Sequence, residues 1–387
     1  MTLTQKRLLI TGGVVVLIAA VTIFLIATRR ENKPVATQPI QGGEELLPAP
    51  EAPRMDEVVT SGKSGPALRK ISENTVFDFW VSYDGRDIYY LGNDGRIFAG
   101  KNGPDLEVST EKLSALNRIE PSPSSTKILA AFGDPRRPQW AVFGASDRFW
   151  SPLPGNIIEA TWGKNDNQIF AFGTDDAIRE IDLSKSPFGE KTVMKNINPK
   201  DIRLLYYPDN KLFLLEKPSG IYESRIFQID LKTLSINLMF AAQKGGALAF
   251  SEDRNWIFKY SSRDGVSLLT KALSLLVPEE ADADVSVSFP TLPSKCNSWQ
   301  TILFCFVPLK PADGTLFPDD YFAGRFYSID DLYKVDLETG FGDLIIRRGE
   351  NPLGIVDAKN VKVRDNKIYF MDRYDNALYE LALTNDK

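Results

Sequence analysis

The sequence predicts one N-terminal transmembrane helix followed by an all-β domain. A β-propeller of seven blades is the arrangement that the sequence favours for this domain. Three observations support this prediction. An apolar run spans Leu8 to Thr28, a proline-rich segment follows it, and the rest of the chain repeats a pattern of short strands. The expected domains are therefore a short head with the anchor at 1–30, a flexible tether at 31–66, and a propeller at 67–387 with an insert at about 309–327.

The composition excludes several classes of function. The chain has 387 residues, a net charge of −5 and no histidine, so a Ser-His-Asp triad, a histidine-ligated metal and imidazole proton transfer are ruled out. The acidic balance argues against a nucleic-acid partner, and two cysteines cannot form a four-cysteine metal site. A phosphate loop, a dinucleotide fingerprint and a G-x-S-x-G motif are also missing from the sequence. No cofactor and no catalytic residue is predicted.

The apolar run from Leu8 to Thr28 has 21 uncharged residues, close to the roughly 20 that a helix needs to cross a bilayer. It is longer than the apolar part of a signal peptide, and Ala27-Thr28-Arg29 is a poor cleavage site. An uncleaved anchor in the cytoplasmic membrane is predicted, with a buried soluble helix as the alternative. Cationic residues flank both ends, so charge does not set the orientation. The short head favours an extracytoplasmic C-terminal domain.

The segment 31–66 is rich in proline, glycine and acidic residues and has no aromatic residue. Such a composition cannot bury enough apolar surface to fold, so it reads as a flexible tether.

The residues after the tether repeat one unit seven times. Each unit has an apolar or aromatic strand, a polar turn rich in Asp, Asn, Ser or Gly, and a second apolar strand, and a third strand follows in most units. Successive units begin 40–45 residues apart, except for a spacing of 66 before the last. This period is typical of β-propeller blades. The second strands are expected to begin near Ile88, Ile128, Ile169, Leu212, Ile257, Ile302 and Ile368.

The last unit reaches Leu383 with only three strands, so its fourth strand must come from elsewhere in the chain. Ala67 to Ile71, just before the first unit, is the predicted donor. Such closure removes the exposed strand edges of an open array. A two-sheet sandwich and rings of six or eight blades are the alternatives.

The sixth unit departs from the repeat because an insert at about 309–327 separates its second and third strands. The preceding connection, Pro278 to Pro290, is acidic. Departures from a repeat usually map to loops on one face, so both segments are expected together near the sixth blade. The resulting candidate binding patch consists of Glu279, Glu280, Asp282, Asp284, Asp313, Asp319, Asp320, Tyr321, Phe322, Asp330 and Asp331.

An acidic patch with aromatic residues suits a cation, a basic peptide or a glycan. Calcium prefers carboxylate oxygens, but no stretch matches an EF-hand loop, so no metal is assigned. The alternative is a solvated loop that packs its own Phe317, Tyr321 and Phe322 as a lid. A propeller glycosidase would need two carboxylates in the central channel, and the sequence does not identify such a pair.

The two cysteines flank the Asn297–Gln300 turn of the sixth unit, so they lie on adjacent strands. Outside the cytosol such a pair is normally oxidised, which makes Cys296 and Cys305 a candidate disulfide. The repeat offsets Cys305 by a few residues from the position opposite Cys296, and disulfide geometry is strict. The alternative is a pair of small buried apolar side chains.

The sixth unit also carries a family resemblance. The order of Cys305-Phe306-Val307-Pro308, Pro318 to Tyr321 and Asp330 to Gly340 resembles bacterial single-span, membrane-anchored WD40-like or TolB-like propellers, common in candidate-phyla-radiation bacteria. The turn between the cysteines is shorter here than in that family. The resemblance implies a location and a fold, and it brings no catalytic residue or activity to carry over.

The combined prediction is a membrane-anchored extracytoplasmic propeller that acts as a non-enzymatic binding or scaffold module at the cell envelope. Its partners would be the membrane, through Leu8–Thr28, and a protein, peptide or glycan ligand. The main alternative is a propeller enzyme that processes glycans or peptides with paired carboxylates. A third possibility is a subunit of an envelope assembly.

Overall fold

The computed structural model describes residues 66–383 with short gaps. The gaps are 102, 110, 199–200, 252–255, 262–265, 272–284, 288 and 310–313. The predicted anchor at Leu8–Thr28 and nearly all of the predicted tether lie outside the described residues. No helix among the described residues is long and apolar enough to cross a membrane.

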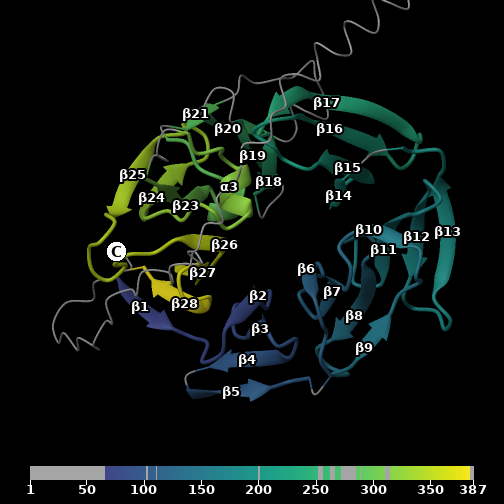
Figure 1. Cartoon of the computed structure of the whole chain (residues 1–387), viewed down its shortest axis with the longest axis horizontal. Helices are drawn as coiled ribbons and strands as arrows, with labels where there is room; N and C mark the ends of the chain where they lie inside the picture. Colours follow the sequence, from purple (N-terminus) through teal and green to yellow (C-terminus); the bar gives the residue numbers. More distant parts are fainter. Residues whose placement is uncertain are drawn as a thin grey trace, which may run out of the picture. The chain divides into compact units, whose positions relative to one another are not determined.

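The described residues form seven four-stranded antiparallel sheets, each of which is one blade (Figure 1). Blade 1 consists of β2 (Val76–Val81), β3 (Ile88–Gly92), β4 (Ile97–Lys101) and β5 (Gly103–Glu107). Blade 2 consists of β6 (Leu116–Pro121), β7 (Lys127–Phe132), β8 (Gln139–Gly144) and β9 (Trp150–Pro152). Blade 3 consists of β10 (Ile157–Trp162), β11 (Gln168–Gly173), β12 (Ile178–Asp182) and β13 (Gly189–Met194). Blade 4 consists of β14 (Ile202–Tyr207), β15 (Lys211–Glu216), β16 (Glu223–Asp230) and β17 (Ser235–Lys244).

Blade 5 consists of β18 (Ala247–Phe250), β19 (Trp256–Ser261), β20 (Val266–Lys271) and β21 (Val285–Val287). The short helix η2 (Pro293–Lys295) leads into blade 6, which consists of β22 (Cys296–Trp299), β23 (Ile302–Pro308), β24 (Asp330–Asp336) and β25 (Gly342–Ile346). The helix α3 (Asp319–Phe322) lies in the insert of blade 6. Blade 7 consists of β26 (Ala358–Arg364), β27 (Lys367–Asp372), β28 (Ala377–Ala382) and β1 (Ala67–Lys70).

The sequence repeat predicted the starts of the second strands to within one residue. The second strand of every blade begins at, or one residue before, its predicted position, because each starts where an apolar run follows a polar turn. The predicted closure is also confirmed. β1 pairs antiparallel with β28 from Ala67 opposite Ala382 to Lys70 opposite Tyr379, so the first strand completes the last blade.

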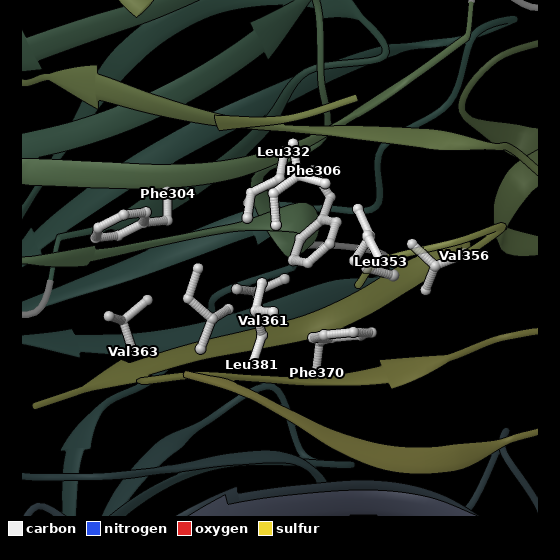
Figure 2. Close-up of a cluster of buried hydrophobic side chains, with 12 residues drawn as sticks. Phe304, Phe306, Leu332, Leu353, Val356, Val361, Val363, Phe370 and Leu381 are labelled. Atoms are coloured by element: carbon white, nitrogen blue, oxygen red, sulfur yellow. The ribbon is translucent and has the colours of Figure 1, made fainter. Parts of the chain in front are cut away.

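Buried apolar side chains fill the space between each pair of neighbouring blades in the described part of the chain. Figure 2 shows the cluster between blades 6 and 7, where Phe304 and Phe306 of β23 face Val361 and Val363 of β26. Inner strands are covered on both sides, which explains their nearly continuous apolar sequences. Burial of this apolar surface is the main force that holds the blades together.

The connection before blade 6 differs from the prediction. Pro278 to Pro290 was expected to join two blades, but Val285–Val287 pairs with β20 as the outer strand of blade 5. This strand is too short to show a pattern in the sequence. The segment 272–284 therefore lies between β20 and β21. Because neighbouring strands are antiparallel, the flanking ends Lys271 and Val285 lie at the opposite end of the blade from the turns that join second and third strands.

Candidate functional site

The insert of blade 6 packs against the propeller through its aromatic residues. Phe317, Tyr321 and Phe326 form a cluster with Tyr260 of β19 and Leu292, which precedes η2. Tyr321 is buried, and burial raises the pKa of its hydroxyl to about 12. The insert therefore has the packed, lid-like form given above as the alternative, except that Phe322, one of the three aromatic residues expected to pack, is half exposed.

The insert also reaches the loop that joins β15 and β16 in blade 4. The Ser219 hydroxyl donates a hydrogen bond to Asp319 Oδ1 at 3.0 Å, and the Gly220 amide donates to Asp319 Oδ2. A Cβ atom at residue 220 would lie 2.8 Å from the Phe317 carbonyl oxygen, so this close approach requires glycine. Asp319 thus anchors the start of α3, which belongs to the insert of blade 6, to the β15–β16 loop of blade 4.

Arg373, in the turn between β27 and β28 of blade 7, holds the other side of the insert. Its guanidinium donates to the Tyr321 carbonyl at 2.8 Å and to the Phe326 carbonyl at 3.2 Å. The same group lies over two rings, 3.9 Å from the centroid of Tyr321 and 4.6 Å from that of Tyr327. A planar guanidinium suits this combination of stacking and forked donation. Blades 4, 5 and 7 therefore all hold the insert of blade 6.

A fully buried ion cluster lies beneath the insert. The Lys295 ammonium donates to Asp330 Oδ2 at 2.6 Å, Asp357 Oδ1 at 2.7 Å, the Ala358 carbonyl at 2.9 Å and the Ser328 hydroxyl at 3.0 Å. Lys295, Asp330 and Asp357 are each 0% exposed. Three lysine protons thus meet four acceptors, and the charge of the buried ammonium is fully compensated.

The charges of this cluster balance in pairs. Arg373 donates to Asp357 Oδ2 at 2.8 Å, so two cations face two carboxylates. Burial alone would lower the pKa of Lys295, but the charges of Asp330 and Asp357 outweigh it and raise that pKa above its ordinary value. Next to the cluster, burial raises the pKa of the Asp372 carboxyl to about 7. The cluster rigidly joins the entry to blade 6, its third strand and the entry to blade 7.

Only part of the predicted acidic patch lies among the described residues. Glu279, Glu280, Asp282, Asp284 and Asp313 lie outside the described residues. The other candidates come together around the insert, yet each described aspartate has a partner within the chain. Besides Asp319 and Asp330, Asp320 pairs with Arg325 at 2.7 Å and Asp331 pairs with Arg348.

Sequence reasoning missed the residues that neutralise these aspartates, namely Lys295, Ser328, Arg348, Asp357 and Arg373. One signal was available. Lys295 is the single charged residue between positions 285 and 309. A lone charge inside an apolar stretch indicates a buried group that needs a partner. The identity of the partners could not be read, because Asp330 and Asp357 are distant in the sequence.

Cys296 and Cys305 form a disulfide between β22 and β23, with Cα atoms 4.2 Å apart. The two residues are directly opposite each other in the strand register. The offset expected from the repeat is therefore wrong, because the turn between the strands is short. This bridge lies immediately after Lys295, at the root of the insert.

A second set of charges joins the inner strands of blades 2 and 3. Arg118 of β6 pairs with Glu159 of β10, and with Glu120 at 3.2 Å. Thr161 Oγ1 also donates to Glu120 at 2.7 Å. Burial raises the pKa of Glu159 despite the charge of Arg118. One guanidinium therefore holds two carboxylates. In the part of the chain that is described, no group of three or more Cys, Asp or Glu side chains is arranged to hold a metal ion.

Comparison with solved structures identifies the architecture. The tricorn protease matches with a TM-score of 0.52 and 11% identity, over 85% of this chain and 36% of that chain, so this chain spans about a third of that protein's length. The Cps50 (Swd1) β-propeller domain of Myceliophteria thermophila matches with a TM-score of 0.52 and 12% identity, over 82% and 100%. The chain is a β-propeller. No protein-family model and no curated protein matches it. Identities this low show the fold alone.

Proposed function

We propose that this propeller is a non-enzymatic binding or scaffold module held at the cell envelope by Leu8–Thr28, with a protein, peptide or glycan as its ligand. One observation carries the proposal. The insert is fixed to blades 4, 5 and 7, and apolar side chains beside it stay exposed. Rigid presentation of such side chains lowers the entropy lost on binding.

The exposed side chains come from the insert and from the blade 4 loop that contacts it. Tyr222 is 73% exposed and Ile221 is 51% exposed, directly after the Gly220 contact with Asp319. Phe322 of α3 is 51% exposed. Exposed aromatic side chains of this kind stack on sugar rings and fill peptide pockets, and they dominate many interfaces. We call Ile221, Tyr222 and Phe322 the apolar rim.

The binding proposal is tested with a peptide array and a glycan array probed with the full chain in detergent. Wild-type protein is expected to bind a defined set of spots. A Tyr222→Ala, Phe322→Ala double variant is expected to lose at least about tenfold in affinity, because hot-spot aromatic residues contribute about 2 kcal/mol or more.

The matched control is Tyr83→Ala. Tyr83 is 74% exposed in the β2–β3 turn, at the end of blade 1 that corresponds to the other face. This variant should bind like wild type. Equal binding by the rim variant and wild type would show that the apolar rim is not the site.

The proposed location is tested separately. The full chain should sediment with membranes and be released only by detergent, whereas a chain starting at residue 31 should remain in the supernatant. Protease added to intact spheroplasts should digest the propeller if it faces outward. Protection until the membrane is permeabilised would place the propeller in the cytoplasm.

An enzymatic alternative rests on Glu120 and Glu159, the carboxylates that Arg118 joins. Two such groups are the minimum for glycoside hydrolysis. Hydrogen bonds from Arg118 and Thr161 occupy both carboxylate oxygen atoms of Glu120, and Arg118 also donates to Oε1 of Glu159. Release of reducing sugars from an arrayed glycan, abolished by Glu159→Gln, would favour the enzyme over the binding module.

A further inference from the structure

The buried cluster of Lys295, Asp330 and Asp357 has no role in the proposed function, yet its geometry suits a reaction. Lys295 Nζ lies 2.6 Å from an oxygen of Asp330 and 2.7 Å from an oxygen of Asp357. The three side chains are excluded from solvent, and the Tyr321 ring lies 5.0 Å from the Lys295 nitrogen. An amine held against a carboxyl group in a dry site gains the large rate advantage of an intramolecular reaction.

We propose that Lys295 and Asp330 condense after folding to form an intramolecular isopeptide bond. The geometry selects Asp330 over Asp357 as the acceptor. Asp357 Oδ2 accepts from the Arg373 guanidinium at 2.8 Å and from the Ser328 amide at 3.0 Å, so this carboxyl group is also held by a second cation. Among the described residues, Asp330 forms an ion pair with Lys295 alone.

The reaction balances without any further reagent. An ammonium and a carboxylate give an amide and one water. Lys295 first transfers a proton through Asp357 Oδ1 and the Ser328 hydroxyl to Asp330 Oδ1, and the free amine then attacks Cγ of the neutral Asp330 carboxyl group to form the C–N bond. The nitrogen loses a second proton. Both protons reach Asp330 Oδ1, whose bond to carbon breaks as water leaves, and Asp357 returns to its carboxylate form.

Two groups in the cluster support these steps. The Ala358 amide donates to Asp330 Oδ2 at 2.8 Å, where the negative charge of the tetrahedral intermediate develops. The Ser328 hydroxyl lies 2.7 Å from Asp330 Oδ1 and 2.9 Å from Asp357 Oδ1. It therefore bridges the base and the leaving oxygen, which is the position of a proton relay.

The product is electrostatically favourable at this position. Amide formation removes one ammonium and one carboxylate from a site where charges are costly, and it leaves Asp357 paired with Arg373. The bond would tie η2 to β24. Together with the adjacent Cys296–Cys305 disulfide, it would covalently join three neighbouring strands of blade 6 at the root of the insert.

Mass spectrometry of the full chain, reduced and unfolded, tests the proposal. The expected mass is lower than the sequence mass by one water. An Asp-Gly sequence such as Asp84-Gly85 can also lose water by cyclisation, so tryptic peptides must be mapped. The expected product joins peptide 326–334, which contains Asp330, to a peptide that trypsin has failed to cut after Lys295. The full sequence mass would overturn the proposal, as would a link to peptide 349–359 through Asp357.

A variant tests the relay. Ser328→Ala keeps every charge of the cluster and is expected to slow linkage about a hundredfold in a time course after cell-free synthesis, as for loss of acid–base catalysis. Ser219→Ala is the matched control, because it removes a hydroxyl from another aspartate of the same insert. It should link at the wild-type rate. Equal rates for all three proteins would overturn the role of Ser328.

Discussion

Single side chains determine how this propeller tolerates buried charge. Lys295 and Asp330 are fully buried and matched by neighbours at hydrogen-bond distance, and Arg118 compensates two carboxylates at once. Removal of one member leaves an uncompensated charge, which destabilises a fold more than the pair stabilised it. The strongest effects of mutation are therefore expected at these residues rather than at exposed aspartates.

Asp372 should make stability depend on pH. Burial raises the pKa of its carboxyl group from the ordinary value to about 7. At pH values between these two, the folded protein keeps a proton on Asp372 that the unfolded protein has released. The free energy of unfolding should therefore fall as pH rises from about 5 to 8. Asp372→Asn still accepts from the Asp357 and Tyr374 amides and cannot ionise. Urea denaturation should show that, between about pH 5 and 8, the free energy of unfolding of this variant falls by about 2 kcal/mol less than that of wild type. Parallel pH curves for the two proteins would contradict this assignment.

Arg118→Met should destabilise the propeller. It leaves Glu120 and Glu159 partly buried without their cation, at an expected cost of about 3–5 kcal/mol near neutral pH by chemical denaturation. The loss should shrink in acid, where the carboxylates become protonated. Arg86→Met is the control, because Arg86 is 84% exposed and lies 3.6 Å from Asp84. Surface pairs of this kind contribute little, so no measurable change is expected there. Equal losses of free energy of unfolding in the two variants would show that the ion pairs of Arg118 stabilise the fold no more than a surface pair does.

At the scale of elements, the insert behaves as a part of the propeller wall rather than as a free loop. Its position in the sequence was predicted correctly because it interrupts a regular repeat. Its contacts were not predictable, because Ser219 and Arg373 lie far from it in the sequence and only the closed ring brings them to it. For the same reason the expected acidic patch consists, among the described residues, of aspartates that are already paired.

Arg373→Lys should loosen the insert without unfolding the blades. Lysine keeps a charge for Asp357 but cannot stack on two rings and donate to two carbonyls, so about 1–2 kcal/mol of local stabilisation is lost. Hydrogen exchange of the amides in 324–326, which bond to carbonyls of the insert, should accelerate about tenfold. Amides of β24 and β27 serve as the internal control and should be nearly unchanged. Uniform acceleration over the whole chain would mean that Arg373 stabilises the entire fold.

At the scale of the whole molecule, the seven-bladed ring could be predicted from the sequence because each blade leaves the same local pattern of strand, polar turn and strand. Closure by β1 was also predictable by counting strands. The outer strand β21 was not, since three residues carry no periodicity. The predicted membrane anchor and envelope function remain predictions that the fold does not address.

Removal of β1 should weaken the entire ring. A chain that begins at Ser72 loses the pairs from Ala67 to Lys70 with β28 and the packing of Leu68 on the blade 6–7 cluster. Its free energy of unfolding should fall by at least about 2 kcal/mol in urea, with association visible by light scattering through the unpaired edge of β28. A chain that begins at Gly65 keeps β1 and should match wild type apart from the missing N-terminal residues. Wild-type stability without β1 would show that closure contributes little.

The pairing of β1 with β28 also has a consequence for biosynthesis. β1 is the first strand of the propeller to leave the ribosome, and its partner β28 is the last, so the two meet only after the strands of the other six blades have emerged. Until then each blade can form in turn, but the ring stays open and its terminal strands stay unpaired. Closure of the ring is therefore the last step in forming the propeller, and the open ring that precedes it is the state most exposed to pairing with a neighbouring chain.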